Sequence, residues 1–558
     1  MTIDRRQLLF AGGAAALVPW LPAWAQPVSS GLPTVSGSDI HLQIAHRMLT
    51  VDGRASHAIG INGTIPGPLV RLKEGTQARI HVTNGLEGED SSIHWHGLIL
   101  PFHMDGVPGI SFPGIAPGKT FTYEFPVKQS GTYWYHSHSG LQEQMGHYGP
   151  LVIDPAGADP VVYDREHVIV LSDHSARHPH MIFKKLKQMG GYYNRQKQTL
   201  AGMLAGKDQS AAERLQWGAM RMDPTDVSDV TASAYTYLAN GHGPEDNWTG
   251  LFRAGERVRL RVINASAMTT FNVRIPGLKM TVVQADGLNV RPVRIDEFQI
   301  GVAETYDLVV EPEDRAYTLV AENSDRSGMA RATLAPRAGM VAPVPPLRER
   351  PLATMKDMGM MDHAAMGHGG GPAMAHDMRD MNLAPTVKDT PAVQTISPMP
   401  VDRTGEPGQG LENVEGALTY RDLVALDRNP DTRTPSRAMQ IHLTGNMERY
   451  MWAFDGMKMN EVKAPIPFTL GERVRVTLVN DTMMTHPIHL HGHFFELVTG
   501  KGDHAPRKHT VNVQPGGKVT FDLTADAPGD WAFHCHLLYH MHAGMMQVVT
   551  VRPAGEAA

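Results

Sequence analysis

Gly75-Thr-Gln-Ala-Arg-Ile-His-Val-Thr-Asn84 is the first of three related stretches in the chain. The second is Gly255-Glu-Arg-Val-Arg-Leu-Arg-Val-Ile-Asn264, and the third is Gly471-Glu-Arg-Val-Arg-Val-Thr-Leu-Val-Asn480. Each contains a turn glycine, an alternating strand and a turn asparagine, with the same glycine-to-asparagine spacing. Strands with a period of two, bounded by turn residues, indicate sandwiches or barrels. We therefore predict an all-β chain with three Greek-key domains.

A second pattern separates the outer copies from the middle one. After the first copy, Pro117-Gly118 leads to Gly131-Thr-Tyr-Trp-Tyr-His136, and after the third, Pro515-Gly516 leads to Gly529-Asp-Trp-Ala-Phe-His534. The middle copy continues through Tyr317-Thr-Leu-Val-Ala321 and has no histidine there. We predict that the first and third domains carry ligands and that the middle domain is structural. Unrelated β domains with similar strands are the alternative, which the matched spacing disfavours.

The domain bounds follow from where the repeat is interrupted. We predict β domains at residues 38–158, 159–335 and 406–555, with a helical insertion at about 181–222 in the middle one. Residues 336–405 are rich in Pro, Gly, Met and His, a composition typical of a flexible linker.

Composition and the N-terminus limit the possible functions. The 558 residues carry a formal charge of −6, which gives no reason to expect a nucleic-acid partner, and the single cysteine excludes an intrachain disulfide. Residues 1–25 resemble an export signal, with Arg5-Arg6, a short apolar run and Ala23-Trp24-Ala25 as the cleavage site. The paired arginines favour the twin-arginine route to the periplasm over an ordinary secretory signal. No segment is long and apolar enough to predict a membrane span.

Histidine pairs separated by one residue are unusually frequent. Chance predicts roughly one or two such pairs at this histidine content, whereas the chain has seven. Residues two apart on a strand share a face, so both imidazoles can reach one site. Four clusters recur at matching places in the repeat, namely His94-Trp-His96, His136-Ser-His138, His486-Pro-Ile-His489-Leu-His491 and His534-Cys-His536. The pair His178-Pro-His180 lies outside the repeat and is interpreted as surface histidine.

The cysteine stands inside the last cluster. A lone cysteine is most often a small buried hydrophobe, but Cys535 has histidine on both sides, His540 five residues on and Met545 ten residues on. A thiolate, two imidazoles and a weak thioether suit a mononuclear blue copper site, with His486 as the second imidazole, whereas zinc more often collects several cysteines. On a strand, His534 and His536 point away from Cys535, so they can bind other coppers behind it and complete a short covalent electron path.

With these four clusters in order, the sequence resembles the multicopper oxidases, the family of laccases and ascorbate oxidase. It is most similar to their bacterial copper-resistance branch, in Asp105-Gly-Val-Pro-Gly-Ile, Gly140-Leu-Gln-Glu-Gln-Met-Gly, Asn247-Trp-Thr-Gly-Leu-Phe252 and the methionine–histidine linker. The resemblance implies three cupredoxin-like domains and four coppers. It assigns His486, Cys535, His540 and Met545 to the type 1 copper, His94 and His489 to the type 2 copper, His138, His491 and His534 to one type 3 copper, and His96, His136 and His536 to the other.

One departure from relatives concerns protons. Many relatives have carboxylates in the loop after the His-Cys-His triplet, but residues 537–544 contain no acid. Reduction of oxygen to water consumes protons, so the acid must come from elsewhere. By resemblance, Asp105 follows the first motif where relatives have an acid near the type 2 copper, and we predict that it is the proton donor.

The resemblance implies one-electron oxidation at the type 1 copper and four-electron reduction of O2 to water at the other three. Eight methionines in residues 355–381 favour Cu(I) as the electron donor, since thioethers prefer that ion. We therefore predict a monomeric cuprous oxidase that acts in copper resistance. The alternatives are a laccase-like oxidase of phenols or aromatic amines and a periplasmic copper-sequestering protein.

Overall fold

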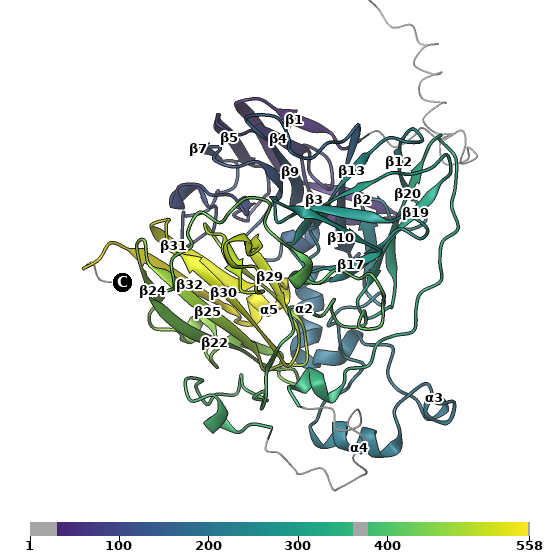
Figure 1. Cartoon of the computed structure of the whole chain (residues 1–558), viewed down its shortest axis with the longest axis vertical. Helices are drawn as coiled ribbons and strands as arrows, with labels where there is room; N and C mark the ends of the chain where they lie inside the picture. The colour runs from purple at the N-terminus through teal and green to yellow at the C-terminus, as the bar shows by residue number, and fades with distance from the viewer. Residues whose placement is uncertain (1–30, 361–377, 556–558) are drawn as a thin grey trace, which may run out of the picture.

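The computed structural model describes residues 31–360 and 378–555. Strands account for 39% of the structure and helices for 11%, so the all-β prediction is confirmed. Figure 1 shows the first domain at the top, the middle domain in teal at the right and the third domain in green and yellow at the lower left. No helix in these two ranges has the length and apolar character needed to cross a membrane. The predicted signal at residues 1–25 lies outside the described residues.

Two sheets enclose the core of the first domain, in the orders β1-β4-β9-β8-β6 and β3-β2-β5-β7. Their strands are β1 (Thr34–Ser36), β2 (Asp39–Val51), β3 (Arg54–Ile61), β4 (Leu69–Lys73), β5 (Gln77–Asn84), β6 (His94–His96), β7 (Thr120–Pro126), β8 (Gly131–His136) and β9 (Tyr148–Asp154).

The middle domain has the sheets β11-β10-β13-β18-β15-β16 and β12-β20-β19-β14-β17. Its strands are β10 (Arg165–His174), β11 (Thr236–Ala239), β12 (Trp248–Leu251), β13 (Val258–Asn264), β14 (Phe271–Arg274), β15 (Met280–Ala285), β16 (Leu288–Ile295), β17 (Glu297–Ile300), β18 (Thr305–Val310), β19 (Tyr317–Asn323) and β20 (Met329–Ala335). Three helices follow β10, at α2 (Pro179–Gln188), α3 (Leu200–Leu204) and α4 (Ala211–Ala219).

The third domain has the sheets β23-β22-β25-β30-β27-β28, which β21 joins at β30, and β24-β32-β31-β26-β29. Its elements are β21 (Val401–Asp402), β22 (Arg437–Asn446), β23 (Met451–Phe454), β24 (Ile466–Thr469), β25 (Arg473–Asn480), β26 (His486–Leu490), β27 (Phe495–Leu497), β28 (Arg507–Lys508), β29 (Thr510–Val513), β30 (Gly517–Thr524), β31 (Gly529–Cys535), the helix α5 (Leu538–Ala543) and β32 (Met546–Arg552).

The three repeated stretches form β5, β13 and β25, which occupy the same place in their sheets. Each pairs in parallel with an earlier strand and antiparallel with a later one. The glycines that precede them have φ of +81°, +81° and +80°, a conformation that strongly favours glycine. Each closing asparagine donates its side-chain amide to two backbone carbonyls and accepts the N–H two residues on. The three copies therefore share the same asparagine hydrogen bonds as well as the same strand pattern.

The described part of the segment 336–405 packs against the domains, where composition predicted a flexible linker. Met358 is part of the main apolar core, and buried Arg403 donates to the Pro515 carbonyl of the third domain at 2.7 Å. Val387, Val393 and Ile396 belong to a small apolar cluster. The segment is also joined to the third domain by hydrogen bonds from Lys388 N–H to the Asp455 carbonyl at 2.9 Å and from the Thr390 hydroxyl to the Gly456 carbonyl at 2.6 Å. Met366, His368 and the other methionines and histidines of 361–377 lie outside the described residues.

Candidate metal centres

Two strand pairs bring the predicted histidines together from the first and third domains. In the first domain β6 pairs with β8, so that His94 lies opposite His136. In the third domain β26 pairs with β31, so that His489 lies opposite His534. The ring of His96 stacks on that of His489 at 3.8 Å between centroids, which joins the two domains at this point.

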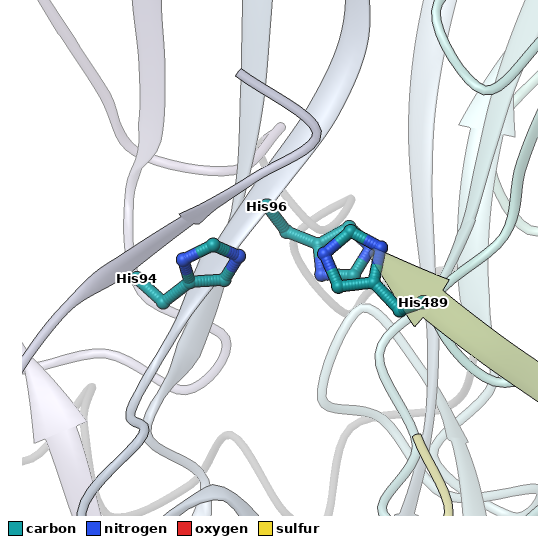
Figure 2. A group of neighbouring side chains, drawn as sticks. All are labelled: His94, His96 and His489. Atoms are coloured by element: carbon teal, nitrogen blue, oxygen red, sulfur yellow. The ribbon is translucent and has the colours of Figure 1, made fainter. Parts of the chain in front are cut away.

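Figure 2 shows the first group, in which His94 and His96 face His489. Its ligand atoms lie within 4.8 Å of one another. The Nε2 atoms of His94 and His489 and the Nδ1 atom of His96 are buried and lack a hydrogen-bond partner among the described residues. The opposite nitrogens are fixed, since Nδ1 of His94 bonds the Asp105 carbonyl at 2.7 Å and Nδ1 of His489 bonds the His509 carbonyl at 2.8 Å.

Two further groups lie beside the first. In one, the Nε2 atom of His534 is 3.0 Å from that of His491 and 3.5 Å from that of His138. The other contains His96, His136 and His536, so that His96 has neighbours in two groups. The predicted division of the eight histidines is compatible with this arrangement, although position alone would allow His96 in either group.

The imidazoles are suited to bind metal. Burial lowers the pKa of seven of them, and to about 4 for His534. They are therefore neutral at pH 7, with free lone pairs. A buried polar atom without a partner costs about 1–3 kcal/mol, so several such nitrogens directed at one another indicate a missing partner. Imidazole is a good ligand for copper, and the donor set fits a copper cluster.

A separate group surrounds the cysteine. The Cys535 sulfur lies 3.5 Å from Nδ1 of His486 and 3.9 Å from Nδ1 of His540. Burial raises the pKa of this thiol well above its usual value, so a thiolate here requires a bound cation. The indole of Trp452 stacks on the His540 ring at 3.8 Å. A buried sulfur and two buried imidazoles fit a mononuclear copper site.

The fourth predicted ligand of this group, Met545, is buried beside it. Its carbonyl accepts the N–H of Cys535 at 3.1 Å, and its own N–H donates to the His540 carbonyl at 3.0 Å. Backbone hydrogen bonds of Met545 therefore connect Cys535 and His540, two other predicted ligands of the mononuclear site. His178 and His180, interpreted as surface residues, lie at the start of α2, where His178 caps the helix.

Three family models, each described as multicopper oxidase, match residues 43–158, 166–338 and 432–555. The chain belongs to the multicopper oxidase family. This multicopper oxidase is 49% identical to a copper resistance protein A homolog of Pseudomonas syringae pv. tomato, over 95% of each chain. It is 47% identical to copper resistance protein A of Escherichia coli, over 98% of each. It is therefore an oxidoreductase that binds copper, and the predicted resemblance is confirmed.

Solved structures show the same fold at low sequence identity. Fet3p, a multicopper oxidase that functions in iron import, superposes with a TM-score of 0.65 at 19% identity, covering 93% of this chain and 90% of that one. The laccase of Botrytis aclada has a TM-score of 0.64 at 22% identity, over 93% and 88%. These likenesses confirm the cupredoxin-like architecture.

Asp105, the predicted proton donor, lies between two groups of the multicopper oxidase. It is 1% exposed, and its Oδ2 accepts a hydrogen bond from Nδ1 of His491 at 2.9 Å. Its Oδ1 lies 3.4 Å from Nδ1 of His94 and is buried without a hydrogen-bond partner among the described residues. One side chain thus contacts predicted ligands of both the type 2 and a type 3 copper.

Sequence reasoning missed two further buried acids. Glu143 Oε2 lies 2.8 Å from Nδ1 of His136, and burial raises the pKa of this carboxyl well above its usual value. Asp229 Oδ2 lies 2.7 Å from Nε2 of His540 and accepts the Tyr450 hydroxyl at 2.7 Å. Glu143 lies inside the quoted stretch that begins at Gly140, so it could have been nominated. Asp229 belongs to the middle domain, and no pattern in the sequence connects it with His540.

Proposed function

We propose that this enzyme is a cuprous oxidase of copper resistance that carries four coppers per chain. His486, Cys535, His540 and Met545 would hold the type 1 copper, and the three histidine groups would hold one type 2 and two type 3 coppers, divided as the family resemblance implies. When bound, these coppers would supply one-electron oxidation of the substrate and reduction of O2 to water. Support comes from the convergent unpartnered nitrogens and from the sulfur beside two imidazoles.

The protein would contribute the path between the two centres and the protons. His534 and Cys535 end β31 and His536 follows it, and by strand alternation the sulfur and the two flanking rings point to opposite faces. The covalent route from sulfur to imidazole is thereby kept short. Asp105 would pass a proton through its buried Oδ1, beside His94, and would orient His491 through Oδ2. Its exclusion from solvent favours transfer within the site.

The observation that favours Cu(I) over a bulky phenol is how closed the protein is around His540. This histidine is fully buried and bonded to Asp229, which is itself buried. The adjoining cavity measures about 20 Å³ and is lined by Asp229, Met268, Met484 and Leu537 among others. Pockets for drug-sized organic molecules are typically ~300–1,000 Å³. A cavity with a carboxylate and two methionines in its lining suits a small soft cation instead.

Helix α2 of the insertion further shields the surroundings of His540 from solvent. Phe183 stacks on Tyr539 of α5 at 5.7 Å, and Lys187 donates to the Tyr450 carbonyl at 2.8 Å. Because α5 carries His540, α2 covers one side of the proposed mononuclear site. The methionines of 355–381 would add ligands that capture Cu(I), as composition predicts. We further propose that the enzyme is a monomer, exported by the twin-arginine route, that meets the ion in the periplasm.

Oxygen consumption by the purified, copper-loaded protein tests the proposal. We expect rapid uptake with Cu(I) held by a weak chelator, and at least tenfold lower kcat/KM with a bulky phenol. Faster phenol oxidation, unaffected by added copper, would favour the laccase-like alternative. Copper binding without oxygen uptake would favour the sequestering alternative.

The division of ligands has its own test in His489→Ala. The type 1 group contains no atom of His489, so the blue absorbance should remain, whereas oxygen reduction should stop. The type 2 electron paramagnetic resonance (EPR) signal should be lost. A variant that retains this signal and the parent rate would refute the assignment of His489.

A further inference from the structure

A second kind of metal-ligating cluster lies on the outer face of the first domain. On β2 and β5 the residues Ile40, Leu42, Ile80 and Val82 are buried in the core. Because neighbouring residues on a strand point to opposite faces, Asp39, His41 and His81 must point outward. Parallel pairing places His41 directly beside His81. The sheet thus brings one carboxylate and two imidazoles onto one patch of surface.

The distances within this patch suit a metal ion. One ligand atom from each of Asp39, His41 and His81 lies within 4.8 Å of the other two. Asp39 Oδ1 is 2.8 Å from Nε2 of His81, and the two imidazole rings stack at 4.6 Å with 18° between their planes. A small rotation of the exposed His41 ring would turn its nitrogen toward the same point.

The surroundings hold one imidazole in place and leave the other free. Nδ1 of His81 bonds the Thr122 hydroxyl on β7 at 2.9 Å, which orients the ring with Nε2 toward Asp39. Hydrogen bonds of this kind typically fix a metal-binding histidine. The ring nitrogens of His41 have no hydrogen bond to any residue in the described ranges. Arg79, beside Asp39 in the register, bonds Glu124 instead at 3.2 Å, so the Asp39 carboxylate remains available.

The patch is separate from the copper centres already described. His94 and His96 lie on β6 in the other sheet of the domain, and Trp95 between them packs in the same core as Ile40 and Ile80. The apolar core of the domain therefore stands between β6 and the outward-facing patch. A metal bound there would not exchange directly with the four groups.

We propose that Asp39, His41 and His81 form a surface site for Cu(II). Two imidazoles and a carboxylate, without a thiolate or thioether, favour the divalent ion over Cu(I), and Cu(II) binds such ligands more tightly than the other first-row divalent ions. Cu(II) is also the product of the proposed reaction, although the site stands on its own geometry whichever donor the enzyme oxidises.

The test uses the full chain with its resident coppers in place, checked by blue absorbance and copper content. Titration with Cu(II) in a calorimeter should show a further equivalent, and the EPR difference spectrum should show nitrogen hyperfine coupling. His41→Ala/His81→Ala should remove this equivalent, and Asp39→Asn should weaken it by about tenfold or more. All variants should stay blue.

Gln43→Ala/Thr83→Ala is the matched control, because these residues are partners in the same register of the same two strands. It should bind the further equivalent like the parent. The proposal is overturned if the parent binds no Cu(II) beyond its resident coppers, or if the double histidine variant binds it with the parent dissociation constant. Displacement of the ion by equimolar Zn(II) would contradict the choice of Cu(II).

Discussion

The outer domains and the middle domain contribute to the centres in different ways. Every histidine in the four groups comes from the first or third domain. The middle domain instead supplies buried carboxylates, since Asp229 bonds His540 and Asp286 accepts the backbone N–H groups of His509 and Thr510. The Thr510 hydroxyl in turn lies 3.2 Å from Nε2 of His96 and 3.2 Å from Nδ1 of His489. The domain predicted to be structural therefore positions predicted ligands that it does not itself provide.

The largest effect should follow from a change in a ligand-bearing domain. Cys535→Ser should abolish the blue absorbance and the activity, because in the proposed site the thiolate–copper bond gives the colour and the bound copper accepts the electron. The circular dichroism spectrum should remain, since the domain cores do not depend on one sulfur. A blue, active Cys535→Ser enzyme would contradict the assignment of the mononuclear site.

Asp105→Asn should have the next largest effect. Asparagine preserves the shape but cannot take up and release a proton at this position. Loss of a general acid typically lowers turnover by ~10²–10⁴-fold. Copper analysis should still find the full complement of coppers. Turnover close to that of the parent would mean that another group, such as Glu143, delivers the protons.

Asp229→Asn tests the contribution of the middle domain to the mononuclear site. Loss of a carboxylate that orients a metal ligand typically costs ~10–100-fold, and we expect a fall of this size in kcat/KM for Cu(I), with the blue colour retained. Stopped-flow spectroscopy of the reduction of the blue site by Cu(I) measures this step directly.

Asp226→Asn is the control in the same loop. Burial, with Asp229 nearby, raises the pKa of Asp226 to about 8, so this carboxyl is mostly protonated at pH 7 and asparagine mimics it. It should behave like the parent. Equal losses in the two variants would attribute the effect to the loop and not to the bond with His540.

The smallest effect on activity is expected for Asp286→Asn, which should act on stability. Lys508 is fully buried between Asp286 and Glu304, at 3.0 and 3.1 Å. Burial would lower the pKa of Lys508, but the two carboxylates hold it above its usual value. Removing one partner of a buried ion pair costs ~3–5 kcal/mol, which should lower the midpoint of thermal unfolding.

Asp296→Asn breaks the solvent-exposed pair with Lys279 and provides the comparison. Such surface pairs contribute ~0–1 kcal/mol, so its unfolding midpoint should be nearly unchanged. Asp286 lies in the middle domain and Lys508 in the third. If both variants have the unfolding midpoint of the parent, the ion pair between Asp286 and Lys508 does not stabilise the contact between these domains.

Local features of the sequence were sufficient to predict the fold and the histidines that the structure brings together. Alternation and turn residues define β5, β13 and β25, and histidines two apart must share a face of a strand. The linker was harder to predict, because Met358 and Val387 stand among polar residues and only their packing partners reveal that they are buried.

The sequence by itself determined the all-β architecture and which histidines share a face of a strand, because strand periodicity fixes which side chains lie on the same side. It also predicts ligands in the outer domains and a mononuclear site centred on Cys535. Only the tertiary structure decided which side chains the buried carboxylates contact. Asp229 lies 311 residues from His540 along the chain, and Asp105 lies 386 from His491. Contacts over such separations depend on how the domains pack, and no local pattern encodes that packing.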